Sequence, residues 1–300
     1  YLSVSTLGPR VYAIRLIDGA AATMWYTALF TYAADLVPEQ RRAEGLAVFG
    51  VSGLIPLGLG AFSGDVILAS AGFREVFIVA LALAVLGLLF CLPLRDVSRA
   101  HTGQTARSGS LLRNASDRNL LSLWVAAFTF FVGVVVVFTF VKTFIVAKGI
   151  GSMGSFFGAY ATTAVLLRVF LGWLPDRLGA RRMVGISMSF YACGFIALAL
   201  ADTSVGVLIA GLLLGAGHGY TFPVLLSLVV TRSPAEERGA ATAFFMALDW
   251  LSLLVAGPMV GYAIEHIGYG QSFVAIGMTV ALGTGVFYLL DHPRTVRPSA

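Results

Sequence analysis

The chain has little charge for its length. Of its 300 residues only 12% are charged, whereas 58% are hydrophobic, and its mean hydropathy is +0.88. An ordinary soluble domain carries about 25% charged residues, and a globule of this size cannot hide so much apolar surface from water. The composition therefore excludes a soluble domain and predicts an all-α integral membrane protein that crosses the bilayer many times.

Several kinds of functional residue are also scarce. The chain has only two cysteines, both inside apolar runs, which excludes a disulfide framework and a zinc site built on cysteine pairs. Neither lysine, Lys142 or Lys148, lies in a phosphate-binding loop, and no Gly-x-Ser-x-Gly nucleophile turn occurs. We therefore expect no enzyme activity, no metal, no cofactor and no ATP-driven transport. An integral membrane enzyme is a remote alternative, which an acid–histidine or metal cluster at the membrane face would favour.

Apolar runs of the length that crosses a bilayer, about 20 residues, recur along the whole chain. They cover 11–36, 42–67, 74–94, 119–147, 154–174, 182–201, 205–231, 240–265 and 271–291. Most of the 20 basic residues lie in alternate connections, at 37–41, 95–118, 175–182, 232–239 and after Asp291. The positive-inside rule places those segments in the cytoplasm. We therefore predict a multi-pass protein of the cytoplasmic (inner) membrane whose linker and C-terminus are cytoplasmic.

The chain also contains an internal repeat. At one constant shift, Gly19 falls on Gly215, Pro38 on Pro234, Arg42 on Arg238, and Gly72-Phe73 on Gly268-Tyr269. Two parallel helical halves are a known transporter architecture. The predicted organisation is 1–94 as the remainder of an N-terminal bundle, 95–118 as a linker, 119–291 as a C-terminal six-helix bundle and 292–300 as a tail. The repeat also predicts about 80 further residues ahead of Tyr1, so the first bundle is expected to be incomplete.

One polar connection carries the most specific motif. It runs Gly172-Trp173-Leu174-Pro175-Asp176-Arg177-Leu178-Gly179-Ala180-Arg181-Arg182 and resembles the loop signature of the major facilitator superfamily. Its glycines suit a tight turn between helices, and its aspartate suits a helix N-terminus beside an arginine. We interpret this loop as part of a gate. The expected gating residues are Gly172, Asp176, Arg177, Gly179, Arg181 and Arg42, with Arg181 or Arg42 as the partner of Asp176.

The resemblance extends along the whole chain. Residues 15–19, 35–42, 233–239 and 257–261 resemble further helix and loop motifs of that family. The resemblance implies a monomeric secondary transporter with two bundles and alternating access. In the family's order, the complete spans of this chain are the fourth to the twelfth. The pattern is most similar to bacterial sugar-efflux and drug-efflux members. The antiporter motif of the fifth helix is degraded, since residues 60–64 read Gly-Ala-Phe-Ser-Gly.

Charged residues inside spans are costly and are functional candidates. Arg15 and Asp18 stand on one helix face, so we predict a proton-coupling pair, a static ion pair being the alternative. Asp249 is the second predicted coupling acid, and a packing contact is the alternative. Other candidates for the cavity are polar or aromatic span residues. They are Trp124, Lys142, Tyr160, Arg168, His218, Tyr220 and Trp250. The alternatives are a structural tie to the cytoplasmic gate for Arg168, an interfacial position for Lys142, a hydrogen bond to a neighbour for His218, and packing or interfacial anchoring for the aromatic residues.

The function predicted from the sequence is secondary active transport of a small organic solute, a drug or a sugar. Proton-coupled efflux is the first hypothesis, and proton-coupled uptake is the alternative. The expected partners are the solute, protons and the lipid bilayer. Because the basic residues follow membrane topology, no nucleic-acid partner is expected.

Overall fold

The computed structural model describes residue 2 and residues 8–94, 116–234 and 237–291. The predicted linker 95–118 and tail 292–300 lie almost entirely outside the described residues. Every regular secondary-structure element of the described residues is helical. The helices are α1 (Pro9–Leu36), η1 (Glu39–Arg41), α2 (Arg42–Ser70), α3 (Phe73–Cys91), α5 (Leu121–Lys148), α6 (Met153–Leu171), α7 (Leu174–Leu178), α8 (Ala180–Ala199), α9 (Ser204–Arg232) and α10 (Arg238–Leu290). The fold class predicted from the composition is thereby confirmed.

Six of the described helices are long and apolar enough to cross a membrane. One of them, α10, joins two predicted spans across a kink at Gly268, where the backbone has φ 79°. Gly72, its counterpart in the repeat, has φ 105° where α2 gives way to α3. Because only glycine adopts such φ values without strain, the repeat extends to the backbone of these two turns.

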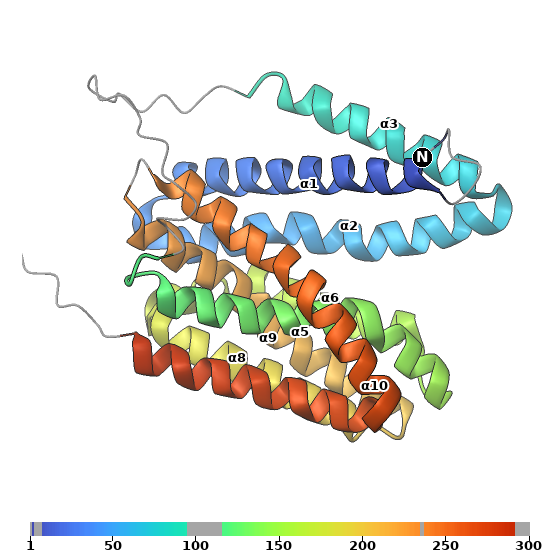
Figure 1. Ribbon diagram of the computed structural model, residues 1–300. Helices are drawn as coiled ribbons and strands as arrows, with labels where there is room; N and C mark the ends of the chain where they lie inside the picture. Colours follow the sequence, from blue (N-terminus) through green and yellow to red (C-terminus); the bar gives the residue numbers. More distant parts are fainter. Residues whose placement is uncertain (1, 3–7, 95–115, 235–236, 292–300) are drawn as a thin grey trace, which may run out of the picture.

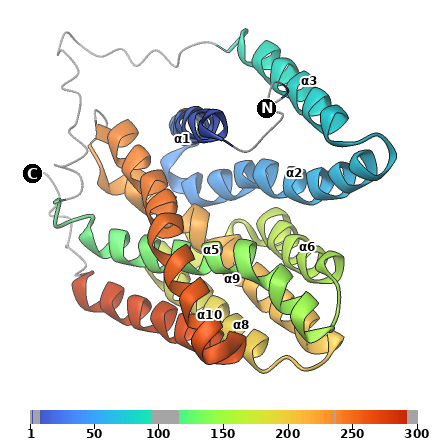
Figure 2. The ribbon, with the colours of Figure 1, turned by 45° about the vertical axis from the view of Figure 1, so that its right-hand side comes forward.

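The described helices form two unequal groups. In Figures 1 and 2, α1, α2 and α3 lie on one side of a larger bundle made of α5, α6, α8, α9 and α10. The larger bundle holds most of the buried apolar residues, with Phe130, Tyr191 and Phe273 fully enclosed. No residue of α3 is buried. Much of the apolar surface of these helices therefore stays exposed, as expected where lipid is the solvent.

Glycines let α9 run close to its neighbours in the larger bundle. A Cβ on Gly217 would lie 2.7 Å from the backbone nitrogen of Tyr191 on α8, and one on Gly215 would collide with the Tyr160 carbonyl on α6. Small residues at such contacts are the usual device for packing helices in a membrane. The stretch Gly215-Ala216-Gly217-His218-Gly219 therefore serves close helix packing.

Gly217→Ala is expected to destabilise the larger bundle. Its methyl group would meet the backbone of α8 rather than a flexible side chain, and overpacking of this kind costs about 1–3 kcal/mol. Gly257→Ala is the matched control, because a Cβ there has no neighbour within 4 Å. Thermal unfolding in detergent should show a lower Tm for Gly217→Ala only, and equal Tm values for the two variants would contradict the packing argument.

Candidate functional site

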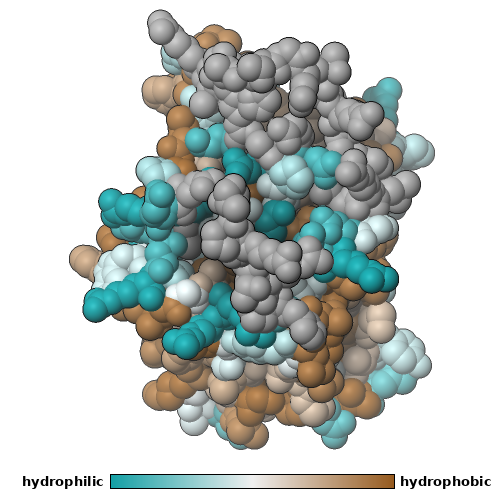
Figure 3. Space-filling view, turned by 90° about the vertical axis from the view of Figure 1, so that its left-hand side faces the viewer, coloured by the Kyte–Doolittle hydropathy of each residue, from teal (hydrophilic) through white to brown (hydrophobic). Residues whose placement is uncertain are grey.

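The charged connections gather at one end of the molecule, which we call the basic end. It contains the C-terminus of α1, the N-termini of α2, α5 and α10, and the α6–α8 connection (Figure 1). Figure 3 looks onto this end and shows hydrophilic side chains surrounded by hydrophobic ones. The two helix groups meet here. In α1 the buried residues are Phe30, Ala33 and Ala34, all in its last two turns, whereas Leu16 is 76% exposed.

An aromatic layer closes the contact between the two groups. Five phenylalanines from five helices make it up, namely Phe30 of α1, Phe49 of α2, Phe131 of α5, Phe222 of α9 and Phe245 of α10. Phe30 meets Phe49 and Phe222 at ring distances of 5.1 and 5.2 Å, and Phe245 meets Phe131 and Phe222 at 5.1 and 5.6 Å. Each residue stands six to ten positions from the basic end of its helix, a depth of about 9–15 Å. The layer is therefore an apolar contact that involves both groups.

Asp176 links the groups at the basic end itself. Its Oδ2 accepts a hydrogen bond of 3.1 Å from the backbone N–H of Glu44, in the first turn of α2. Arg41, just before α2, lies within electrostatic range of Asp176 and pairs with Glu44 at 2.7 Å. A carboxylate at a helix N-terminus is favoured by the unsatisfied N–H groups and by the helix dipole. Asp176 thus caps a helix that belongs to the other group.

Two further cross-group contacts are related by the repeat. The Arg42 guanidinium of α2 donates to the Thr231 hydroxyl of α9 at 3.1 Å. Arg238 of α10, the repeat counterpart of Arg42, lies 3.9 Å from the carboxylate of Asp35, which is the counterpart of Thr231. In each group one arginine therefore contacts the repeat-equivalent position of the other group. Thr231 is not among the residues predicted from the sequence, because it carries a hydroxyl where its repeat counterpart carries a carboxylate.

The other predicted gating residues have separate local roles. Gly179 has φ 92° and joins α7 to α8, and Gly172 is buried where a Cβ would collide with the Arg168 carbonyl. Arg177 is exposed and lies over the Trp173 ring at 5.6 Å. Arg181 has its Nε 3.2 Å from Asp291 at the end of α10.

Asp291 ties together the helix ends of the larger bundle. It accepts hydrogen bonds from Arg232 of α9 at 2.6 Å and from Ser122 of α5 at 3.0 Å. Burial opposes ionisation, but the hydrogen bond and charge of Arg232 outweigh it, so the pKa of Asp291 lies below its ordinary value. This cluster braces the basic end of one group without crossing to the other.

Arg168 is the largest fully buried side chain of the described residues. Pro223 inside α9 has no N–H, which leaves the Gly219 carbonyl without its helical donor. Arg168 Nε donates to that carbonyl at 2.8 Å. Its Nη1 lies 2.6 Å from where a Cβ of Gly50 would stand, so the guanidinium also fills the contact with α2. Arg168 is therefore positioned to join α6, α9 and α2, which fits the structural alternative considered for it.

The predicted aromatic and histidine candidates are mostly inside the larger bundle. The Tyr160 hydroxyl lies 2.5 Å from Nδ1 of His218, with Phe130 against the same imidazole at 5.2 Å. Tyr220 donates to the Leu171 carbonyl at 3.0 Å, and Trp124 packs edge-on against Phe244. These four candidates make internal helix contacts, and the Tyr160 ring reaches Phe138 at 5.9 Å.

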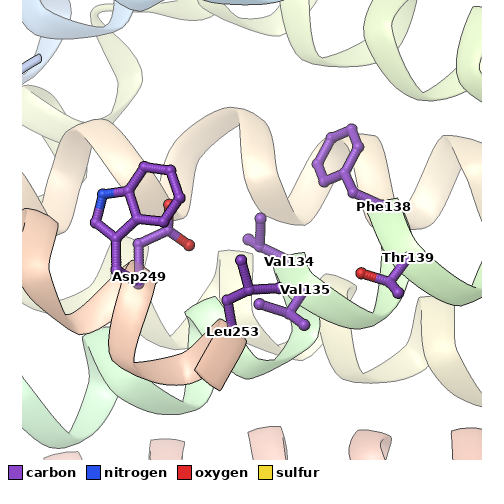
Figure 4. A pocket seen from close by; sticks show the side chains of 7 residues that line it. Val134, Val135, Phe138, Thr139, Asp249 and Leu253 are labelled. Atoms are coloured by element: carbon purple, nitrogen blue, oxygen red, sulfur yellow. The ribbon is translucent and has the colours of Figure 1, made fainter. Parts of the chain in front are cut away.

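A pocket of about 200 Å³ lies between α5 and α10, farther from the basic end than the aromatic layer. Its lining comprises Val134, Val135, Phe138, Thr139, Asp249, Trp250 and Leu253. Figure 4 shows the Asp249 carboxylate and the Thr139 hydroxyl on either side of the apolar Val134, Val135 and Leu253. Asp249 is half-buried and also lies within electrostatic range of Tyr191. The pocket therefore combines an acid, a hydroxyl and aromatic rings.

The remaining predicted residues lie apart from this pocket lining. Arg15 and Asp18 are exposed on the half of α1 away from the basic end, and both have interaction partners. Lys142 is exposed on α5, one turn beyond Thr139. Within the part of the chain that the structure describes, no group of three or more His, Cys, Asp or Glu residues is placed to hold a metal ion.

Comparison with known sequences gives a family match over nearly the whole chain. The family described as Major Facilitator Superfamily matches residues 2–174 and 149–300. The probable galactarate/D-glucarate transporter GarP of Escherichia coli K12 is 27% identical over 153 residues, which is 49% of this chain and 34% of GarP. The chain thus spans about a third of that relative. An uncharacterized MFS-type transporter of Burkholderia mallei is 25% identical over 96% of this chain and 69% of its own length.

Solved structures share the fold at low sequence identity. The Escherichia coli fucose:proton symporter FucP superimposes with a TM-score of 0.68 at 14% identity, over 89% of this chain and 73% of FucP. The human organic anion transporter MFSD10 also gives 0.68, at 16% identity, over 87% of this chain and 67% of its own. Because the family match, the multi-pass helical fold and the two-group arrangement agree, the chain belongs to the Major Facilitator Superfamily.

Proposed function

We propose that the protein is a secondary active transporter that moves a small sugar-acid anion across the cytoplasmic membrane together with a proton. The observation that carries the proposal is the pocket with Asp249, which the aromatic layer separates from the basic end. Alternating access requires a central site that is closed from one side at a time. A half-buried acid beside such a site can take up and release a proton as the access changes.

The sidedness follows from the positive-inside rule. If the basic end faces the cytoplasm, the contacts of Asp176, Arg42 and Arg238 close the cytoplasmic side. The structure then corresponds to an outward-facing state, in which solute reaches the pocket from outside. Breaking these contacts and parting the aromatic layer would open the site inward. The predicted cytoplasmic C-terminus is part of this proposal.

The proposed substrate class, a sugar acid, is taken from the names of related transporters. GarP and the probable galactarate/D-glucarate transporter GudP of Bacillus subtilis, which is 29% identical over 133 residues, are both named for sugar diacids. An anion and a proton favour each other's binding when the proton neutralises a carboxylate next to the anion, and this coupling is reciprocal. A cationic drug would instead compete with the proton. An anionic substrate beside Asp249 therefore favours symport over the export predicted from the resemblance to sugar-efflux and drug-efflux members.

Transport measurements in vesicles test the proposal. Proteoliposomes with the full-length protein should accumulate labelled D-glucarate or galactarate when the outside is more acidic, by about tenfold per pH unit for one proton, since one unit is worth about 1.36 kcal/mol. A protonophore should abolish the accumulation. Accumulation driven only by the reversed gradient would support export by exchange, and the absence of any gradient-driven movement of sugar acids would refute the proposed substrate.

A further inference from the structure

Lys142 stands on the same face of α5 as the pocket. Val135, Phe138 and Thr139 line the pocket, and Lys142 follows them at helical spacing, one turn farther from the basic end. The rise from Thr139 to Lys142 is about 4.5 Å, well within the reach of a lysine side chain. Phe131, nearer the basic end on this face, belongs to the aromatic layer. Lys142 thus follows the pocket lining on this face of α5, on the side away from the aromatic layer.

The two lysines of the chain differ in their surroundings. Lys148, at the end of the same helix, forms an ion pair of 2.6 Å with Asp202 and donates to the Ala201 carbonyl at 3.2 Å. Lys142 is exposed, and among the residues that the structure describes it has no hydrogen-bond or ion-pair partner. An unpaired cation within a membrane span is costly and is a functional candidate by default. The difference indicates that the partner of Lys142 lies outside the described residues.

We infer that Lys142 anchors a carboxylate group of the transported solute at the outer rim of the α5–α10 pocket. The ammonium would bind one carboxylate, and the hydroxyls along the solute would face Thr139 and the protonated Asp249. The ligand is then a hydroxylated carboxylic acid rather than a neutral sugar. This inference rests on the proposed transport function and deepens it, because it names the residue that distinguishes an acid from the matching neutral polyol.

Kinetics of proton-driven uptake give the first test. Lys142→Gln should raise the KM for D-glucarate about tenfold or more with a smaller change in Vmax, because a charge-assisted hydrogen bond to the substrate is lost. Lys142→Arg keeps the charge and should stay within about threefold of wild type. Lys148→Gln is the matched control on the same helix and should leave KM unchanged. A wild-type KM in Lys142→Gln would overturn the inference and leave a lysine that only extends to the membrane interface.

Chemical protection gives a second test that needs no transport. In a Lys148→Arg background Lys142 is the only lysine among these 300 residues, so peptide mass analysis can follow its reaction with an amine-reactive reagent. D-glucarate should slow this reaction, and the matching neutral hexitol should not. If wild-type protein moves no sugar acid, the proposed function fails. The proposed role of Lys142 can still be tested separately, by measuring whether a series of mono- and dicarboxylates slows its labelling. Labelling at equal rates with every acid and with its neutral analogue would refute the anchor.

Discussion

Asp249→Asn is expected to abolish proton-driven accumulation of the substrate while leaving its exchange across the membrane. The amide has nearly the shape of the carboxylate but binds no proton, so the pocket keeps its form and loses its coupling. Wild-type protein should concentrate D-glucarate about tenfold per pH unit, and the variant should reach only equal concentrations inside and outside. The measurement is a pair of assays on the same vesicles, accumulation under a pH gradient and counterflow exchange without one.

The Arg15–Asp18 pair supplies the competing assignment, and the same assays decide between them. The sequence favours this pair, because a cation one turn away lowers the proton affinity of a carboxylate. Both residues are exposed on α1, whereas Asp249 lines the pocket. We therefore expect Asp18→Asn to retain accumulation. Loss of accumulation in Asp18→Asn together with normal accumulation in Asp249→Asn would return the coupling site to α1.

Asp176→Asn is expected to reduce transport to less than about a tenth of the wild-type rate, with near-normal insertion into the membrane. The substitution keeps an acceptor for the Glu44 N–H but removes the charge that favours the α2 N-terminus and Arg41. Hydrogen bonds to charged groups contribute about 1.5–3 kcal/mol, and 1.4 kcal/mol already changes a two-state equilibrium about tenfold. The state closed at the basic end would therefore be depopulated. The measurement is the initial rate of uptake per inserted protein.

The control for this gate variant is a carboxylate far from the basic end. Asp202→Asn removes an 82% exposed carboxylate that pairs with Lys148, a contact within the larger bundle. Its transport rate should stay near wild type, since exposed ion pairs contribute less than about 1 kcal/mol. Wild-type transport by Asp176→Asn would show that the cross-group cap is dispensable and would remove Asp176 from the gate.

The contacts between the two helix groups are many and small, which explains why the sequence indicated only part of the proposed gate. The loop motif pointed to Asp176, because an aspartate among glycines and arginines has few other roles. The aromatic layer was not recognised, because a phenylalanine in a span is ordinary and nothing in a linear pattern aligns five helices at one depth. The sequence contains one sign of this layer, because Phe49 and Phe245 are repeat counterparts and both belong to it.

By itself the sequence determined the class of protein, the internal repeat and the resemblance to one transporter family. These follow from local properties, because hydrophobic length, loop charge and turn glycines act where they stand in the chain. The tertiary structure alone decided which span residues share a pocket. It assigned Arg168 to the carbonyl that Pro223 leaves unpaired, Asp249 to the pocket wall, and Asp176 to a helix of the other group. Those assignments depend on how helices rotate and meet, and this is fixed by the packing of distant segments against one another.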